Sequence, residues 1–186
     1  MAACTSMSSS ARWRELIPRV VIPRLPRMDF AEKTALLIGT GLGCGFLKPM
    51  APSWASIPGF FYFIVVSRLP LPWALAVFAA LLPPAVWSGG ICERLLACKD
   101  PRPVVIDEIA AVPFALWPLL LHWPVHPLSW IILFAVYRFA DYLKPWPANR
   151  LQSLSGGTGI LVDDLISSAY MGIGLYALIR FFPALL

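Results

Sequence analysis

The sequence predicts an all-α, multi-pass helical membrane protein with about five spanning segments and an interfacial or re-entrant N-terminal helix. Hydrophobic residues make up 59% of the 186 residues and charged residues only 13%, which is about half the charged share of a soluble domain. The mean hydropathy of +0.72 agrees. The apolar residues are also grouped in runs that charged or proline-rich breaks separate. Such a composition excludes a water-soluble domain, a disordered chain and a nucleic-acid-binding protein.

The chain divides into a basic N-terminal arm, residues 1–29, and a helical membrane domain, residues 30–186. Residues 1–27 hold five arginines and one glutamate, so most of the net charge of +5 belongs to the arm. We expect the arm to be mobile. It either lies on anionic lipid headgroups or only holds the N-terminus in the cytoplasm.

The first apolar run, residues 31–46, contains many glycines and is the expected interfacial or re-entrant helix. Gly41 and Gly45 have the spacing of close helix packing. Alternatively, this backbone lines a site together with Lys48, which follows the run and is a candidate phosphate ligand.

Five further apolar runs are the expected spans, although several are shorter than the about 20 residues that a spanning helix needs. They cover residues 54–66, 71–87, 109–123, 128–139 and 161–182. We expect Pro83 and Pro84 to kink the second of them. If the arm is cytoplasmic, alternate crossings put nearly every Lys and Arg on the cytoplasmic side, as the positive-inside rule requires.

The same topology places seven of the ten acids on the cytoplasmic side. These are Glu93, Asp100, Asp107, Glu108, Asp141, Asp163 and Asp164. We expect Glu93 and Asp100 to be solvated loop acids. Because carboxylates near membrane depth are costly, the others are expected to have a partner or a task.

Three clusters of candidate site residues converge on that side. One is a pair of acids before the run 109–123. The second is a set of charged residues at steps of three, which share a helix face. The third is a glycine-rich turn that leads to another pair of acids. In that order, the members are Asp107 and Glu108; Arg138, Asp141 and Lys144; and Gly156, Gly157, Gly159, Asp163 and Asp164.

These residue types indicate a metal-assisted phosphoryl site. Mg²⁺ prefers carboxylate oxygens, and the four paired acids, Asp107, Glu108, Asp163 and Asp164, would repel one another without a cation. Arg138 and Lys144 can clamp phosphate oxygens, and the glycines let backbone N–H groups approach an anion. Asp141 would complete the metal shell or fix Lys144. A metal-bound water would be the nucleophile.

Each cluster also has a purely structural explanation. Acids at a helix start interact favourably with the helix dipole. Arg138 and Asp141 could form an ion pair, and Lys144 could extend its charged end to the membrane interface. The convergence of all three clusters favours the chemical interpretation.

These pieces, in this order, resemble the phosphatidylglycerophosphatase A family over about residues 33–178. They run from the glycine-rich stretch with Pro49-Met50-Ala51-Pro52, through Lys99-Asp100-Pro101 and Val105-Ile106-Asp107-Glu108, to Arg138, Asp141, Lys144-Pro145-Trp146-Pro147, Gly156-Gly157, Gly159 and Asp163-Asp164. The resemblance implies a bacterial inner-membrane enzyme that uses Mg²⁺ to convert phosphatidylglycerophosphate to phosphatidylglycerol, with its site on the cytoplasmic side.

The chain departs from the family pattern after Pro52. The pattern has Gly-Thr and then Gly-Ser, whereas Ser53, Trp54, Ala55 and Ser56 follow here, with one residue fewer. Two other functions remain open, a lipid-headgroup phosphotransferase and a non-enzymatic carrier of divalent cations.

Overall fold

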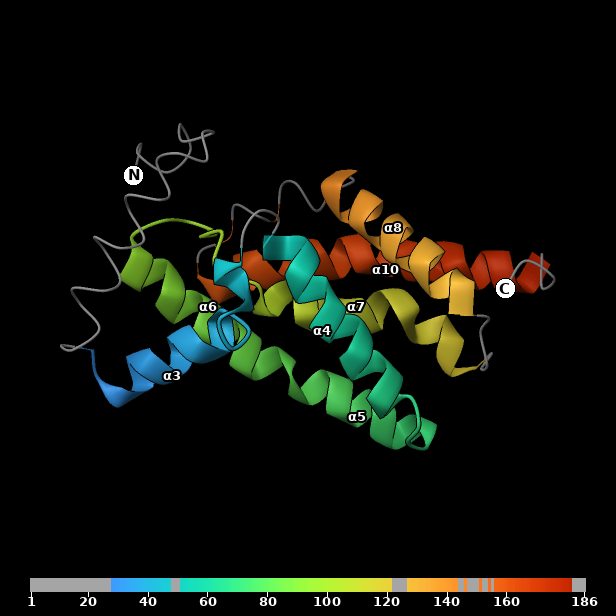
Figure 1. The fold of residues 1–186 in the computed structure, drawn as a ribbon, viewed down its shortest axis with the longest axis horizontal. Coiled ribbons are helices and arrows are strands. Elements are labelled where there is room, and N and C mark those ends of the chain that lie inside the picture. The colour runs from blue at the N-terminus through green and yellow to red at the C-terminus, as the bar shows by residue number, and fades with distance from the viewer. Residues whose placement is uncertain are drawn as a thin grey trace.

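The computed structural model describes residues 28–47, 51–121, 127–143, 146, 151, 154 and 156–181, and the regular elements in these ranges are helices (Figure 1). The α-helices are α3 (Phe30–Gly39), α4 (Ala51–Val66), α5 (Leu71–Ala80), α6 (Leu82–Leu96), α7 (Ile106–Leu116), α8 (Pro127–Leu143) and α10 (Gly157–Phe181). Two short 3-10 helices are η2 (Cys44–Phe46) and η3 (Trp117–Leu120). The all-helical prediction is therefore confirmed for the described part.

Helix boundaries follow local sequence signals. Asp29 caps α3, where its side chain accepts from the Glu32 N–H and the Glu32 side chain accepts from the Asp29 N–H, a capping box. The predicted kink in the second span lies at Leu81, between α5 and α6. It precedes Pro83 and Pro84 because proline fits the first turn of a helix, where its missing N–H has no partner to lose.

Two helical stretches are long and apolar enough to cross a membrane, by length and composition. They are Leu71–Leu96, which joins α5 and α6, and Gly157–Phe181, which is α10. Ser53–Val66 and Ser129–Ala140 are apolar but shorter. The described residues thus support a membrane protein, and the count of about five spans stays a prediction.

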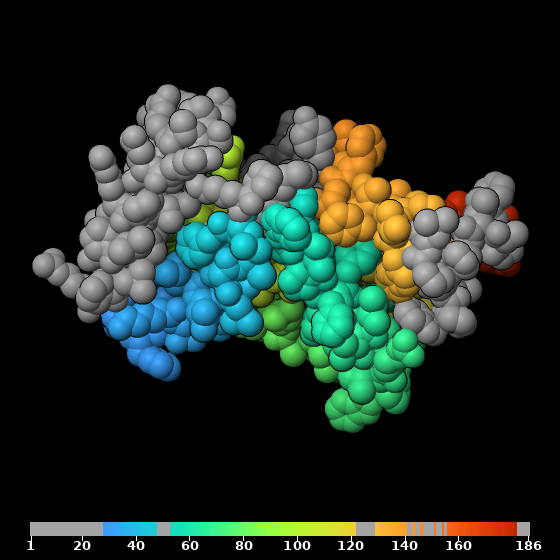
Figure 2. Space-filling view, in the orientation of Figure 1, coloured from blue at the N-terminus to red at the C-terminus, as the bar shows by residue number. Residues whose placement is uncertain are grey.

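Helix α7 is the central element. It packs against α4, α6 and α10, and Figure 1 shows it running between α4 and α10. In the space-filling view, α4 (teal) lies on the viewed face between α3 (blue) and α8 (orange) (Figure 2). The outer surfaces carry large apolar side chains, such as Ile131 on α8 and Ile173 on α10, which suits contact with lipid.

Two apolar clusters surround this central helix. The larger joins α4, α5, α7, α8 and α10 through side chains such as Phe63, Leu116 and Leu175. The smaller joins α6, α7 and the first turns of α10 through side chains such as Ile106 and Ile160. Along both α7 and α10, the acidic residues are flanked by side chains of the smaller cluster, Ile106 and Ala110 on α7 and Leu161 and Leu165 on α10. The fold therefore buries the acids beside this smaller cluster.

Gly172 and Gly174 provide a test of the packing of α10 on α7. A Cβ on Gly172 would lie 2.7 Å from the Phe114 carbonyl oxygen and from Trp117 Nε1, whereas a Cβ on Gly174 would meet nothing within 4 Å. We expect Gly172→Ala to lower the free energy of unfolding by about 2 kcal/mol through overpacking. Gly174→Ala is the matched control, and we expect a gain of about 0.5 kcal/mol from helix propensity. Thermal unfolding of both variants in detergent measures the difference, and equal midpoints would contradict this packing.

Candidate functional site

Four acids from two packed helices are buried. Asp107 and Glu108 lie in the first turn of α7, and Asp163 and Asp164 lie in the second turn of α10. The sequence predicts Asp163 and Asp164 at the threshold of a span. In the structure α10 begins earlier, at Gly157, so both acids lie inside the helix. The helix dipole, which stabilises acids in the first turn, therefore does not explain why acids occur at these two positions.

The glycine-rich loop after α3 holds the chain segment that leads into α7. The Val105 N–H donates to the Gly39 carbonyl at 2.8 Å. A Cβ on Gly41 would lie 3.2 Å from Val105 Cγ2, and a Cβ on Gly45 would collide with the Pro103 carbonyl. Gly41 and Gly45 thus belong to a turn after α3 and not to a contact between two helices, whereas Gly39 at the end of α3 packs closely on Cys92 of α6. The backbone of residues 39–45 lies next to the segment that carries Asp107.

Asp107 is buried and its Oδ1 has no hydrogen-bond partner. Burial raises its pKa well above the usual value, and the charges of Glu108, Asp100 and Asp163 raise it further, although a hydrogen bond from the Glu108 backbone opposes them. A buried carboxylate surrounded by like charges needs a proton or a cation. A cation beside this side chain would be stabilised, as would a proton on it.

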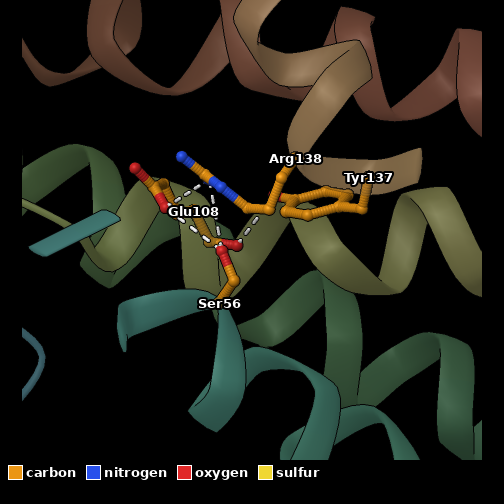
Figure 3. Close-up of polar contacts among 4 residues, drawn as sticks. All are labelled: Ser56, Glu108, Tyr137 and Arg138. Atoms are coloured by element: carbon orange, nitrogen blue, oxygen red, sulfur yellow. Dashed lines mark hydrogen bonds and ion pairs between the residues drawn. The ribbon is translucent and has the colours of Figure 1, made fainter. Parts of the chain in front are cut away.

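Glu108 is the centre of a network that joins α4, α7 and α8 (Figure 3). Arg138 Nη1 lies 3.0 Å from Glu108 Oε2 as an ion pair. The same oxygen accepts from Ser56 Oγ at 3.3 Å, and Arg138 Nη1 also donates to Ser56 Oγ at 3.3 Å. The Tyr137 hydroxyl donates to the Glu108 backbone carbonyl at 3.2 Å. Arg138 is thus anchored on Glu108, on a neighbouring helix.

The donor chemistry of the site suits a hard cation, because Asp107, Asp163 and Asp164 offer buried carboxylate oxygens. Within the described ranges, however, no group of three or more His, Cys, Asp or Glu side chains is already arranged to hold a metal ion. Asp141 belongs to α8, but the structure does not describe its side chain. The predicted ligand set is therefore brought together in part, and its completion stays a prediction.

The three glycines of the predicted phosphate turn have different structural roles. A Cβ on Gly157 would collide with the Val86 carbonyl, and one on Gly159 would collide with the Leu154 carbonyl. Gly156 instead has a positive φ of 74° and open space where a Cβ would be. Packing accounts for Gly157 and Gly159, and the positive φ accounts for Gly156, so a role of these glycines in phosphate binding stays a prediction.

Several predicted residues fall elsewhere. Lys48 and Lys144 lie outside the described residues. Asp100, expected to be a solvated loop acid, is half-buried, has a positive φ of 48°, and acts electrostatically on Asp107. Glu93 is also half-buried, and its Oε2 is buried with no hydrogen-bond partner. Asp100 therefore lies in a loop as expected but is partly buried, whereas Glu93 lies in α6 and not in a loop.

Ser56 and Tyr137 are the site residues that sequence reasoning missed. Ser56 lies in the segment that departs from the family pattern, and Tyr137 looks like one more aromatic residue of an apolar helix. Each is a hydroxyl-bearing residue within an apolar run. This could have been noticed in the sequence, because a hydroxyl that is buried needs a hydrogen-bond partner.

The family model described as phosphatidylglycerophosphatase A matches residues 37–179. A protein of Bacteroides thetaiotaomicron, whose name gives phosphatidylinositol-3-phosphatase as a provisional activity, is 32% identical over 146 residues, covering 73% of this chain and 87% of its own. Phosphatidylglycerophosphatase A of Haemophilus influenzae is 28% identical, covering 76% and 86%. The Escherichia coli protein of the same name is 29% identical, covering 77% and 86%.

No solved structure is significantly similar to this chain. The family match nevertheless covers more than half of the chain and includes the buried acids, Ser56 and Arg138. The chain therefore belongs to the phosphatidylglycerophosphatase A family, a family of phosphoric monoester hydrolases.

Proposed function

We propose that this protein hydrolyses phosphatidylglycerophosphate to phosphatidylglycerol and phosphate with the help of Mg²⁺. One observation carries the proposal: four buried carboxylates of α7 and α10 lie in an apolar helical body whose Arg138 is anchored beside them on Glu108. Acids that would otherwise repel one another, next to a guanidinium, suit a cation and a phosphate group bound together.

The membrane location is part of the proposal. The protein would lie in the bacterial inner membrane with its N-terminus and its site on the cytoplasmic side. The acyl chains of the substrate would stay in the bilayer against exposed apolar faces, such as that of α8 with Ile132 and Phe139. Only the phosphate-bearing headgroup would reach the buried acids.

The relatives leave the choice of lipid open. Two carry the name phosphatidylglycerophosphatase A, and the third is named for a phosphatidylinositol phosphate. Both names describe a phosphate monoester on a membrane lipid. The family match favours phosphatidylglycerophosphate, and the other lipid is the comparison substrate.

Each residue would have a distinct role in the reaction. Asp107, Asp163 and Asp164 would hold Mg²⁺, which when bound supplies positive charge and lowers the pKa of a bound water. One of these carboxylates would orient the attacking water. Glu108 would hold Arg138 in place. That Glu108 also binds the metal, as the sequence suggests, stays a prediction.

Phosphate recognition would depend on the basic side chains. The Arg138 guanidinium would bind two phosphate oxygens and stabilise the charge that develops in the transition state. Lys144 and Lys48 would add positive charge, and Asp141 would orient Lys144 or complete the metal shell. Backbone N–H groups near Gly156 would meet the remaining phosphate oxygen.

Phosphate release from lipids in mixed micelles tests the function. We expect the purified full chain to release inorganic phosphate from phosphatidylglycerophosphate faster than from phosphatidylinositol 3-phosphate. EDTA should abolish release, and added Mg²⁺ should restore it. Faster release from the inositol lipid would overturn the substrate. Activity that survives EDTA would overturn the role of Mg²⁺, and absence of release from any lipid phosphate would overturn the enzyme proposal.

A further inference from the structure

Ser56 uses its hydroxyl across a helix interface. The hydroxyls of Ser67 and Ser88 donate to carbonyl groups of neighbouring residues in the preceding turn, Ile64 and Ala85, which is a common arrangement for serine in or at the end of a helix. Ser56 Oγ donates to the Glu108 carboxylate, 52 residues along the chain. Since Ser56 is fully buried, its hydroxyl is a structural contact and not an accessible nucleophile.

The hydroxyl of Ser56 bridges two opposite charges. Ser56 Oγ donates to Glu108 Oε2 at 3.3 Å, and the same Oγ accepts from Arg138 Nη1 at 3.3 Å. Together with the ion pair, these contacts close a ring of three interactions in which both hydrogen bonds involve a charged group. Such a ring fixes the position of Nη1 more tightly than the ion pair does alone.

The close approach of α4 to α7 makes this short side chain long enough. Gly59 follows Ser56 by one helical turn, and a Cβ at Gly59 would lie 2.8 Å from Val112 Cγ2 and 3.2 Å from Ile109 Cα. Helix α4 therefore packs with its backbone directly against α7. Residue 56 faces Glu108 because positions three apart on a helix share a face.

The anchored nitrogen leaves the rest of the guanidinium to be oriented. Arg138 is the more exposed partner, with 23% of its side chain accessible against 10% for Glu108. In Figure 3 one nitrogen of the guanidinium lies on the side away from Ser56. A planar guanidinium whose Nη1 is fixed has a fixed outer edge, which is the edge that binds phosphate in a bidentate manner.

We infer that Ser56 is a positioning residue that, by bridging Glu108 and Arg138, fixes the guanidinium in the orientation that binds the substrate phosphate. This inference rests on the proposed function. It adds a residue from a segment that departs from the family pattern, and it gives α4 a role in phosphate binding. Ser56 touches no substrate atom and acts only through Arg138.

Phosphate affinity is the measurement that separates positioning from mere stability. We expect Ser56→Ala to weaken binding of inorganic phosphate about tenfold, because a hydrogen bond to a charged group has about that effect. The dissociation constant is obtained from the phosphate-dependent rise of the unfolding midpoint of the full chain with Mg²⁺ present. The lipid KM should rise in parallel. A purely structural defect would reduce the active fraction, and thus kcat, but leave both constants unchanged.

Ser88→Ala is the matched control. Ser88 is also a fully buried helical serine, and its hydroxyl bonds only within its own helix among the contacts described here. We expect its phosphate affinity and KM to equal those of the wild type. If Ser56→Ala binds phosphate as tightly as Ser88→Ala does, the inference is overturned.

A double variant tests whether Ser56 acts through Arg138. In an Arg138→Lys background, which lacks the planar fork, Ser56→Ala should change phosphate affinity by less than about twofold. A tenfold effect in that background as well would show that Ser56 acts independently and would contradict the inference. A wild type that binds phosphate but hydrolyses no lipid phosphate would instead refute the proposed function and leave the positioning role standing.

Discussion

Asp107→Asn is expected to reduce phosphate release severely and to leave the folded protein at least as stable as the wild type. Asp107 is buried among Glu108, Asp100 and Asp163, and its Oδ1 has no hydrogen-bond partner. A charge in such a place costs stability, so the isosteric amide removes repulsion. The same change removes a proposed ligand of Mg²⁺. Because a metal supplies several kcal/mol of transition-state stabilisation, we expect a loss of about 10²–10³-fold in kcat/KM.

Two measurements on the same preparation check this expectation. The unfolding midpoint of the variant without Mg²⁺ should equal or exceed that of the wild type. Added Mg²⁺ should raise the midpoint of the wild type but not of the variant. Asp29→Asn is the control, because Asp29 caps α3 away from the acids and asparagine caps equally well. An active Asp107→Asn protein would show that this carboxylate has no part in the reaction.

Such a trade of stability for function explains why the acids were readable from sequence. In a chain with 13% charged residues, a buried acid without a function would only lower the stability of the fold. Asp107, Asp163 and Asp164 could therefore be identified from composition and spacing, and the structure buries all three. Arg138 could be identified in the same way. Its ion pair in the described structure is with Glu108, and the pair with Asp141 stays a prediction because the Asp141 side chain is not described.

Helix positions were predictable where apolar runs are continuous, as in α4 and α8. The start of α10 was not. Gly157 and Gly159 have low helix propensity, so the run was expected to begin at residue 161. The backbone of Gly157 packs directly on α6, beside Val86 and Gly90, and this tertiary contact extends the helix. No local pattern reports a contact of that kind.

The network around Glu108 was beyond sequence reasoning for the same reason. Glu108 is 30 residues from Arg138 and 52 from Ser56. Their contact depends on how α4, α7 and α8 pack, and in particular on the close approach at Gly59. Residue type indicated which side chains were capable of chemistry, and only the packing shows which of them hold one another.

Arg138→Ala should lose both stability and activity, in contrast to Asp107→Asn. Removing the guanidinium leaves the Glu108 carboxylate, only 10% of whose side chain is accessible, without its ion-pair partner. Breaking a buried pair from one side costs about 3 kcal/mol. Phosphate release should also fall, because the variant has lost its proposed bidentate phosphate ligand. Thermal unfolding and lipid-phosphate hydrolysis measure the two losses.

A compensating variant separates these two effects. Arg138→Met combined with Glu108→Gln removes both charges and keeps side chains of similar size, and such replacement of an ion pair is often neutral for stability. We expect the double variant to recover most of the lost midpoint while phosphate release stays at the level of Arg138→Ala. Recovery of activity together with stability would mean that Arg138 supports the fold alone, and phosphate recognition would then have to come from other basic side chains.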